Sequence, residues 1–415
     1  MQVTWDDSKA ETRSSAQIYA DFSRAAAEGG RAAEEVGDAM AGIDGAAQVI
    51  EAEFHFPYLA HAALEPLDAV LEVTDGKAEL WMGSQFPSLD KPTLAATLGI
   101  DPSDVQINVM FAGGSFGRRA QPTAHVAAEV AEIAKAAGGN GLDADGNIVG
   151  WHDVVVNQSI MAGGPMEGMM KDGMDPTSYE GATKMPYDLP ALRVDWVRQD
   201  SPVSVLWWRS VGHSHTGYAT EVFLDQLLEA GGKDPVQGRL DLMKGDAGRD
   251  RGVLEKVAAL AGWDGTKVKG DRAYGVAVHE SFNTYVAQIV EVSDQGGFPK
   301  VHKIWCAVDC GVAVNPNVIR AQIEGGAGYG LGSVLFDEVT LGEGGTIMER
   351  NFDTYRMLRI NEMPQVEVAI VQSDNDPTGI GEPGLPPVGP AVANAWRALT
   401  GQAVTKLPFT KSVGV

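Results

Sequence analysis

The fold class is decided by two consecutive stretches, RAYGVAVHESFNTYVAQIVEVS at residues 272–293 and KVHKIWCAVDCG at residues 300–311. Both are rich in β-branched and aromatic residues, a composition typical of buried strands. Two amphipathic helical patterns precede them, GYATEVFLDQLLEAGG at 217–232 and RGVLEKVAALAGW at 251–263. The succession of helical and strand signals predicts an α+β fold with mixed sheets.

Toward the C-terminus the strand signal continues in EVAIVQS at 367–373, and a final helix is expected in GPAVANAWRALTG, bounded by Pro390 and Gly401. The two cysteines, Cys306 and Cys310, lie where a strand runs into a turn. A disulfide, a metal site and a reactive thiol are alternatives for this pair. Two thiols without nearby Cys or His partners are too few for a zinc or iron–sulfur site, so we expect core residues.

The N-terminal half also mixes strands and helices. We expect a strand in AQVIEAEFHFPYL at 47–59 and a hairpin in AVLEVTDGKAELWM at 69–82, turning at Asp75-Gly76. Further signals follow in chain order: a helix at 91–100, a strand at 104–112, a helix in HVAAEVAEIAKAAGG at 125–139, and a hairpin in LDADGNIVGWHDVVV at 142–156. Residues 161–188, rich in Gly, Met and Pro, are expected as an extended loop that lines a pocket or faces a partner.

Chain length sets the domain organisation. At ~100–200 residues per domain, 415 residues predict two or three domains. Residues 1–48 hold alanine-rich, charged stretches expected as short helices or linker, a remnant preceding the main body. The two domains that follow are expected at 49–230 and 231–415.

Charge excludes one class of partner. The chain carries 32 Lys and Arg residues against 56 Asp and Glu residues, a net charge of −24, which repels nucleic acid. No apolar run approaches the ~20 residues of a membrane-spanning helix. The start, MQVTWDDSKAETRSS, lacks the basic and apolar regions of an export signal. This predicts a cytoplasmic protein, or a periplasmic one if it is exported with a partner.

Three glycine-bearing segments are candidate ligand-binding turns, because glycine lets backbone N–H groups come close to a ligand. They are GGSFGRR at 113–119, QIEGG at 322–326 and GIGEPG at 379–384. The first follows a strand and precedes an expected helix, a geometry that binds phosphate or oxyanion groups. For any one of them a structural turn is the default interpretation.

Glu382 is the sharpest candidate for chemistry. It lies between Gly381 and Pro383-Gly384, where small neighbours let a substrate or a metal-bound oxygen approach. The alternative interpretation is a turn residue on the surface. No Ser-His-Asp triad is expected, because the sequence has no G-x-S-x-G elbow.

The histidines give weaker signals. His61 and Glu65, four residues apart, lack a further ligand at metal-binding spacing and are expected in a turn. His213 and His215 are expected as pocket or surface residues.

Six segments stand in one order along the chain: FAGGSFGRR (111–119), WWRSVGHSHTGYATEVFLDQL (207–227), AYGVAVHESFNTYVAQIVEVS (273–293), WCAVDCGVAVNPNVIRAQIEGGAGYGLGS (305–333), NFDTYRMLR (351–359) and GIGEPGLPPVGPAVANA (379–395). They resemble successive motifs of the molybdopterin-binding subunits of the xanthine dehydrogenase and aldehyde oxidase family, of the isoquinoline 1-oxidoreductase beta-subunit type. The resemblance runs from about Ala46 to the C-terminus. It implies the α+β fold of that family's molybdenum-cofactor-binding domains.

The resemblance also implies an enzyme. This would be a molybdenum hydroxylase that oxidises an aldehyde or N-heterocycle with water-derived oxygen, using a molybdenum–molybdopterin cofactor in its cytosine dinucleotide form. Glu382 matches the family's general base, which takes a proton from a hydroxyl ligand of the metal. Arg209 matches an arginine at the substrate end of the pocket, where a cation stabilises developing charge.

Cofactor contacts follow from the same motifs, and no side chain of this chain is expected to ligate the metal. The residues implied are Gly113, Gly114, Ser115, Phe116, Gly117 and Arg118 in the first glycine turn, Gly212 after Arg209, Gln322, Gly325 and Gly326 as pterin or phosphate contacts, and Gly381 beside the base.

The resemblance further implies partner subunits. Electrons would leave through a separate [2Fe–2S] small subunit, because this chain has no cluster-binding cysteine set. A cytochrome c subunit is a further partner of the family's type. Longer family members carry a GQG-type motif and a hammerhead domain that this sequence lacks, and a pocket-lining segment that would fall between Gly139 and Gly141. The alternative is therefore an incomplete or split chain, which binds cofactor only with a second polypeptide supplying that N-terminal portion and is not catalytic alone.

Overall fold

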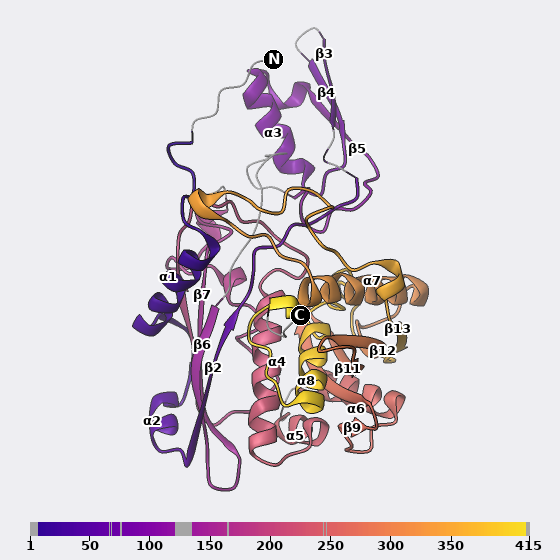
Figure 1. Cartoon of the computed structure of the whole chain (residues 1–415). Helices are drawn as coiled ribbons and strands as arrows, with labels where there is room; N and C mark the ends of the chain where they lie inside the picture. The colour runs from indigo at the N-terminus through magenta and orange to yellow at the C-terminus, as the bar shows by residue number, and fades with distance from the viewer. Residues whose placement is uncertain are drawn as a thin grey trace.

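Three β-sheets and the helices packed on them make up the fold in the computed structural model, which describes residues 7–411 except 66, 68, 75–76, 121–134, 164–165, 244 and 246. Two five-stranded sheets flank a layer of helices, and a three-stranded sheet forms a separate lobe (Figure 1). Each large sheet combines antiparallel pairs with one parallel pair. The predicted α+β class with mixed sheets is therefore confirmed.

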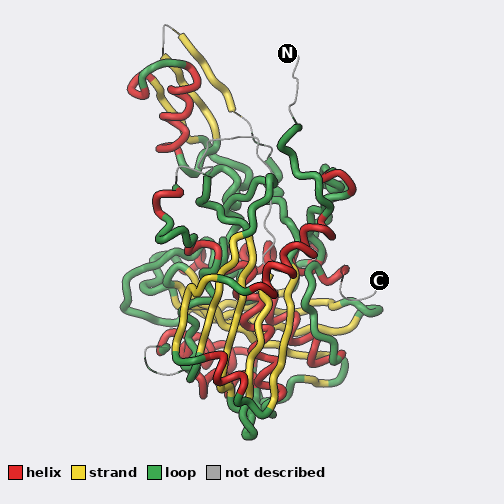
Figure 2. The backbone as a smooth tube through the Cα atoms, turned by 90° about the vertical axis from the view of Figure 1, so that its left-hand side faces the viewer, coloured by secondary structure: helices red, strands yellow, loops and turns green. Residues whose placement is uncertain are grey.

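The first large sheet has the strand order β1-β8-β7-β6-β2, and Figure 2 looks onto its outer side. Its elements are β1 (Arg31–Val36), β2 (Gln48–His55), β6 (Lys135–Leu142), β7 (Ile148–Asn157) and β8 (Leu192–Arg198), with helices α1 (Ser15–Glu28), α2 (Ala39–Asp44) and α4 (His213–Ala230). Successive side chains of a strand point to opposite faces. Val154 of β7 accordingly packs with Phe22 of α1 on the outer face, whereas Trp151 meets Phe223 of α4 on the inner face, ring centroids 5.8 Å apart.

The second large sheet has the order β13-β12-β11-β10-β9. Its elements are β9 (Val268–Lys269), β10 (Arg272–Ser281), β11 (Thr284–Asp294), β12 (Pro299–Asp309) and β13 (Gln365–Ile370), with helices α5 (Pro235–Leu242), α6 (Gly248–Ala261), α7 (Pro316–Leu335) and α8 (Val388–Thr400). Val286 of β11 packs with Ile323 of α7, while the neighbouring Tyr285 lies under Arg249 of α6 at 4.3 Å. Helices α6 and α7 therefore cover opposite faces.

The small lobe carries the first glycine turn. It contains β3 (Ala69–Thr74), β4 (Lys77–Met82), β5 (Val105–Val109) and α3 (Pro87–Leu98), and Ala95 of α3 is buried against Ala78 and Val105. The predicted hairpin is confirmed by the pairing of Thr74 with Lys77, and its turn residues lie outside the described part of the chain. Strand β5 leads directly into residues 113–119.

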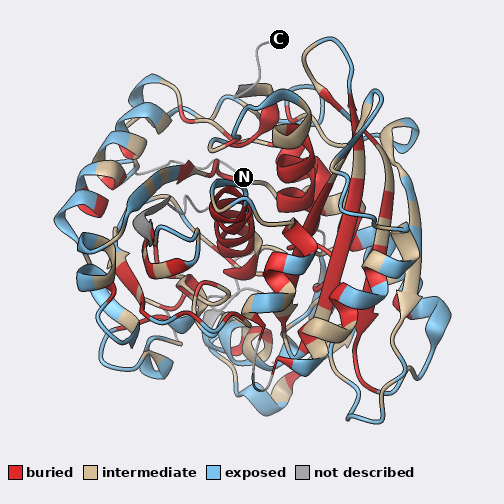
Figure 3. Cartoon of the chain, turned by 90° about the horizontal axis from the view of Figure 1, so that it is seen from below, coloured by how far each residue is buried: buried red, intermediate tan, exposed pale blue. Residues whose placement is uncertain are grey.

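The core lies between the two large sheets. Helix α4 is buried around its whole circumference from Thr216 to Leu228, as expected of a helix enclosed by other elements, and Figure 3 shows such buried helices at the centre of the molecule. Both cysteines are buried and free, which confirms the expected core role. No helix in the described ranges is long and apolar enough to cross a membrane. Short 3-10 helices complete the chain at Pro102–Asp104, Glu167–Met169, Pro176–Ser178, Glu343–Gly345, Ile360–Glu362 and Phe409–Lys411.

In the first large sheet, two expectations about local structure are wrong. Residues 31–36 are not helix or linker: they form β1, which pairs with β8 and gives the sheet its edge. Residues 135–139, expected at the end of a helix, belong to β6, which pairs with both β2 and β7. Pairing on both sides outweighs the helix propensity of the alanines in this stretch. The rest of that expected helix, 125–134, lies outside the described residues.

Candidate active site

Glu382 is held by the turn that precedes α4. Its Oε1 accepts the backbone N–H of Ser210 at 3.1 Å, and the Ser210 hydroxyl donates to the Glu382 carbonyl oxygen at 3.0 Å. Ser210 and Val211 both have left-handed backbone angles, φ +78° and +48°, which residues other than glycine rarely adopt. This strained turn directs a backbone N–H at the carboxylate, an arrangement common at functional sites.

Arg209 joins the same turn to two other predicted residues. Its Nε donates to the Gly381 carbonyl oxygen at 2.9 Å, and its Nη2 donates to the backbone oxygen of Gln322 at 3.3 Å and to the Gln322 side-chain oxygen at 3.2 Å. The structure therefore brings Glu382, Arg209, Gln322 and Gly381 to one place. The guanidinium lies beside the turn that carries Glu382, where it can stabilise negative charge.

The segment at 322–326 was expected as a turn, and this is wrong. It lies inside helix α7, where backbone N–H groups serve the helix itself. Its glycines have a packing role instead: a Cβ on Gly326 would lie 3.1 Å from the carbonyl carbon of Gly384, so its absence lets α7 approach the turn that carries Glu382. A Cβ on Gly325 would meet only Arg209 Nη1, at 3.9 Å, which leaves this helix surface open.

The first glycine turn reaches the same place. Gly114, Phe116 and Gly117 have φ of +109°, +53° and +105°, so the segment expected as a glycine turn has a backbone with positive φ at three residues. A Cβ on Gly117 would lie 1.8 Å from the Trp207 carbonyl oxygen, so the turn packs directly on the segment before Arg209.

An aromatic stack ties these segments together. The Phe116 ring lies on Tyr329 of α7 with centroids 4.4 Å apart, and Tyr329 lies on Trp208 at 4.8 Å. The stack therefore spans the glycine turn, α7 and the segment that ends in Arg209.

The remaining residues of the glycine turn are engaged in local contacts. The N–H of Arg118 donates to the Ser115 carbonyl oxygen at 2.9 Å and closes the turn. The N–H of Gly113 donates to Glu65 at 2.6 Å, and Glu65 also pairs with Arg119 at 2.8 Å. Gly113 thus binds a side chain of the protein itself, and Glu65 serves the loop rather than a metal.

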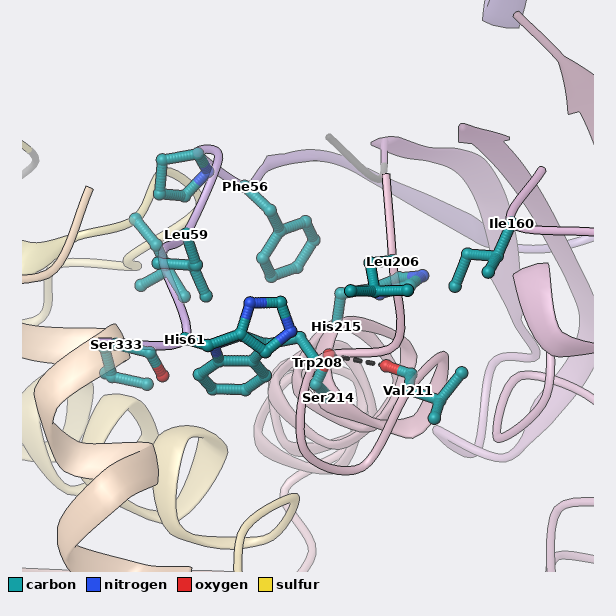
Figure 4. Close-up of a pocket in the computed structure, with 13 residues that line it drawn as sticks. Phe56, Leu59, His61, Ile160, Leu206, Trp208, Val211, Ser214, His215 and Ser333 are labelled. Atoms are coloured by element: carbon teal, nitrogen blue, oxygen red, sulfur yellow. Dashed lines mark hydrogen bonds between the residues drawn. The ribbon is translucent and has the colours of Figure 1, made fainter. Parts of the chain in front are cut away.

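A small cavity lies beside this assembly (Figure 4). His61 and His215 point into it, among Phe56, Leu206 and other apolar side chains. His61 Nε2 donates to the Trp207 carbonyl oxygen at 2.8 Å, so its Nδ1 carries a lone pair. Within the described part of the chain, neither His61 Nδ1 nor His215 Nε2 has a hydrogen-bond partner.

Burial keeps both of these imidazoles neutral. It lowers the pKa of His61 and of His215 to about 4. Two unpaired acceptors facing one cavity suit a small hydrogen-bond donor such as water. His215 is thereby confirmed as a pocket residue.

Glu180 belongs to the site, although nothing in the sequence pointed to it. Its Oε1 accepts the N–H of Gly212 at 3.1 Å. A Cβ on Gly212 would lie 2.4 Å from the Thr177 carbonyl oxygen, so Gly212 serves to admit the loop that carries Glu180. Burial raises the pKa of Glu180 to about 8, and the charge of Glu382 acts in the same direction. That loop, predicted for residues 161–188, does line a pocket.

These surroundings fit a planar, anionic pterin. Gly325 leaves the surface of α7 without a side chain, and the Arg209 guanidinium beside it can pair with phosphate. The glycine turn at Gly114–Gly117 brings its backbone close to the segment of Arg209. In the described residues, no three His, Cys, Asp or Glu side chains form a metal-binding group.

Comparison with known proteins agrees with this geometry. Residues 24–140 and 221–364 each match a molybdopterin cofactor-binding domain family. The chain is 30% identical over 381 residues to the beta subunit of isoquinoline 1-oxidoreductase from Brevundimonas diminuta, an alignment that covers 84% of this chain and 48% of that protein. It is 27% identical over 428 residues to the B subunit of nicotinate dehydrogenase from Pseudomonas putida, covering 90% and 35%. A membrane-bound aldehyde dehydrogenase of Gluconacetobacter polyoxogenes is 30% identical over 420 residues, covering 87% and 53%.

Solved structures share the fold. Quinoline 2-oxidoreductase from Pseudomonas putida 86 superposes with a TM-score of 0.74 at 11% identity, covering 91% of this chain and 78% of that one. Aldehyde oxidoreductase from Desulfovibrio gigas gives 0.74 at 14% identity, covering 92% and 62%. Fold and site together define a molybdopterin cofactor-binding protein, and the chain belongs to the xanthine dehydrogenase family of molybdenum-binding subunits. It spans about half the length of the curated relatives it matches.

Proposed function

We propose that this chain binds a molybdenum–molybdopterin cofactor, in its cytosine dinucleotide form, and hydroxylates an aldehyde or an N-heterocycle with Glu382 as general base. The observation that carries the proposal is the position of the Glu382 carboxylate. The Ser210 N–H fixes one of its oxygens, and the Arg209 guanidinium holds the Gly381 carbonyl next to it. The names of the relatives, which refer to isoquinoline, nicotinate and aldehydes, support this substrate class.

When bound, the cofactor supplies the metal that activates water and accepts the electrons of the substrate carbon. The protein's own residues position the substrate and take up the proton of the water-derived oxygen. Glu382 takes up the proton of the water-derived oxygen, using the carboxylate oxygen that does not face Ser210. Arg209 lies where a cation stabilises negative charge as it develops on the substrate. Phe116, stacked on Tyr329, holds the glycine turn against the pterin surface of α7.

The electron route is part of the same proposal. Relatives whose names call them beta, B or large subunits support an assembly with further chains. We assign electron exit to a [2Fe–2S] small subunit, with a cytochrome c subunit as the acceptor beyond it.

Metal analysis combined with one substitution tests the function. The purified assembly should contain stoichiometric molybdenum, and Glu382→Gln should lower kcat by about 10² to 10⁴-fold while molybdenum and pterin content stay unchanged. Glu255→Gln is the matched control, because the exposed Glu255 pairs with Arg251 at 3.7 Å on α6, which covers the face of the second sheet opposite to α7. A correctly assembled complex without molybdenum, or a Glu382→Gln variant with full turnover, would contradict the proposal.

A second candidate function is cofactor binding that needs another polypeptide and gives no catalysis by this chain alone. It is favoured by the alignment with the isoquinoline enzyme, which covers 48% of that subunit. Affinity purification of the chain from its own cells separates the two candidates. Because the first candidate already expects a [2Fe–2S] small subunit and a cytochrome c subunit, a shared site predicts a further stoichiometric polypeptide beside these, whereas a metal-loaded complex that is active without such a polypeptide would contradict this candidate.

A further inference from the structure

Two carboxylates are bound by one turn. The N–H of Ser210 donates to Glu382 and the N–H of Gly212 donates to Glu180, each at 3.1 Å. Glu382 comes from the turn after β13, whereas Glu180 comes from the loop between β7 and β8. The strained residues 210 and 211 therefore bring two acidic groups to one turn, and the negative charge of Glu382 acts on Glu180 there.

Two imidazoles follow Glu180 in sequence of contact. Glu180 Oε2 lies 3.9 Å from His213 Nε2 at the start of α4, and His213 Nδ1 lies 2.8 Å from His279 Nε2 on β10. Both histidines are buried, with 8% and 6% of their surface exposed. All three side chains line one cavity that opens to solvent, together with Phe282 and Asn283.

We propose that Glu180, His213 and His279 form a proton relay that returns to solvent the proton taken up by Glu382 in each catalytic cycle. This rests on the proposed function, in which Glu382 is the base. Glu180 gains one proton from Glu382 and gives one to His213, and His213 passes one from its other ring nitrogen to His279, which releases one to water in the cavity. Both carboxyl groups end as they began, each imidazole ends with its proton on the other ring nitrogen and returns to its first tautomer by proton exchange with water in the cavity, and no electrons move. The 3.9 Å step is a separation that a bridging water can span.

The charges around Glu180 suit such a relay. The pKa of Glu180 is raised to about 8, mainly by burial. The hydrogen bond from Gly212 lowers this pKa, and the negative charges of Glu382, Asp175 and Glu280 raise it. When Glu382 takes up a proton, its charge disappears and Glu180 holds its own proton less tightly. Proton uptake at the base therefore drives release at Glu180.

The acceptors beyond Glu180 are neutral. Burial lowers the pKa of His213 to about 4 and that of His279 well below its usual range. Lys171, Lys184 and Glu34 also line the cavity. A neutral imidazole that is hard to protonate holds a proton only briefly, which suits transfer rather than storage.

Infrared spectroscopy of the full chain tests the coupling without turnover. The carbonyl band of protonated Glu180, identified as the band lost in Glu180→Gln, should titrate near pH 8. In Glu382→Gln the same band should titrate at a lower pH, because a neutral amide replaces the charge. An unchanged midpoint overturns the relay. Because this measurement requires no cofactor, it can contradict the relay even where the proposed function holds, and the two failures can be distinguished.

Kinetics of the assembled complex give the second test. Glu180→Gln should lower kcat at least about tenfold with KM unchanged, should alter the pH profile of kcat, and should be partly rescued by added imidazole. Glu34→Gln is the matched control: it lines the same cavity but only accepts the Lys184 N–H, at 2.8 Å, and it should leave kcat unchanged. Full turnover of a folded Glu180→Gln variant across the pH range, or a loss that imidazole does not restore, overturns the proposal.

Discussion

Gly117 shows how closely single residues determine this site. A Cβ there would lie 1.8 Å from the Trp207 carbonyl oxygen, and its φ of +105° is unfavourable for any side chain. We expect Gly117→Ala to lower the free energy of unfolding by about 3 kcal/mol. Chemical denaturation of the full chain measures this change.

The matched control for this substitution is Gly168→Ala. Nothing lies within 4 Å of the carbon that this substitution adds, so its effect should stay below about 0.5 kcal/mol. Equal destabilisation by the two substitutions would show that the contact of Gly117 with Trp207 is not what fixes the glycine turn.

At the residue scale, the sequence indicated a candidate site residue only where adjacent residues form a recognisable motif. Glu382 stands in a glycine turn, which pointed to it directly, whereas Arg209 was singled out only by the resemblance of its segment to a motif of the family. Glu180 lies in a loop without periodicity, and its partner Gly212 is 32 positions away. No local pattern could reveal that pairing. The chemical roles assigned to Glu382 and Arg209 remain predictions.

At the scale of elements, the buried guanidinium of Arg239 connects α5 to α4 through ion pairs. Arg239 of α5 pairs with Glu221 at 3.0 Å and with Asp225 at 2.9 Å, all three buried, and Glu221 also accepts the N–H of Val278 on β10. Arg239→Ala should cost about 3–5 kcal/mol, because it leaves two buried carboxylates without a counter-charge. Thermal and chemical unfolding measure the loss.

An exposed pair supplies the control for Arg239. Lys303 of β12 and Glu367 of β13 are 2.7 Å apart at the surface. Lys303→Ala should cost less than about 1 kcal/mol. A loss of similar size for the two substitutions would mean that burial does not govern the Arg239 cluster.

Elements were predictable where pattern and packing agree. The strands β10 to β12 and helix α8 followed from composition and end signals, although α8 begins at Val388, before Pro390. Helix α7 was missed between Gln322 and Gly326 because glycine destabilises an isolated helix by about 1 kcal/mol each and is typical of turns. Close packing of Gly326 on Gly384 stabilises the helix instead, and such a contact between distant segments leaves no local signal.

At the scale of the whole molecule, buried carboxyls determine how stability depends on pH. Burial raises the pKa of Asp153 and Asp250 to about 7 and that of Glu180 and Asp337 to about 8. The folded chain keeps protons on these groups that the unfolded chain has already released above about pH 4 to 5. Stability should therefore fall as the pH rises from 6.5 to 8, by at most about 1.4 kcal/mol per pH unit for each group.

Histidines oppose this trend only weakly above pH 6.5. Those with a pKa lowered to about 4, namely His61, His213 and His215, reduce stability mainly as the pH falls from 6.5 toward 4, where the unfolded chain binds the protons, and at pH 6.5 each unfolded imidazole is already about half deprotonated. Denaturant titrations at pH 6.5 and pH 8 measure the difference. Replacing Glu180 by Gln and Asp337 by Asn should flatten the dependence. A free energy of unfolding that rises over this interval would argue against the buried, protonated state.

Arg209 contacts residues that are synthesised much later than Arg209 itself. Arg209 bonds to Gln322 and Gly381, 113 and 172 positions further along the chain. Translation proceeds at about 5–20 residues per second, so the glycine turn and Arg209 emerge from the ribosome well before α7 and the segment of Glu382. A cofactor arriving during translation would meet half of its binding surface. On the proposed function, we therefore expect cofactor to bind only after the segment that carries Glu382 has emerged and folded onto the turn of Arg209.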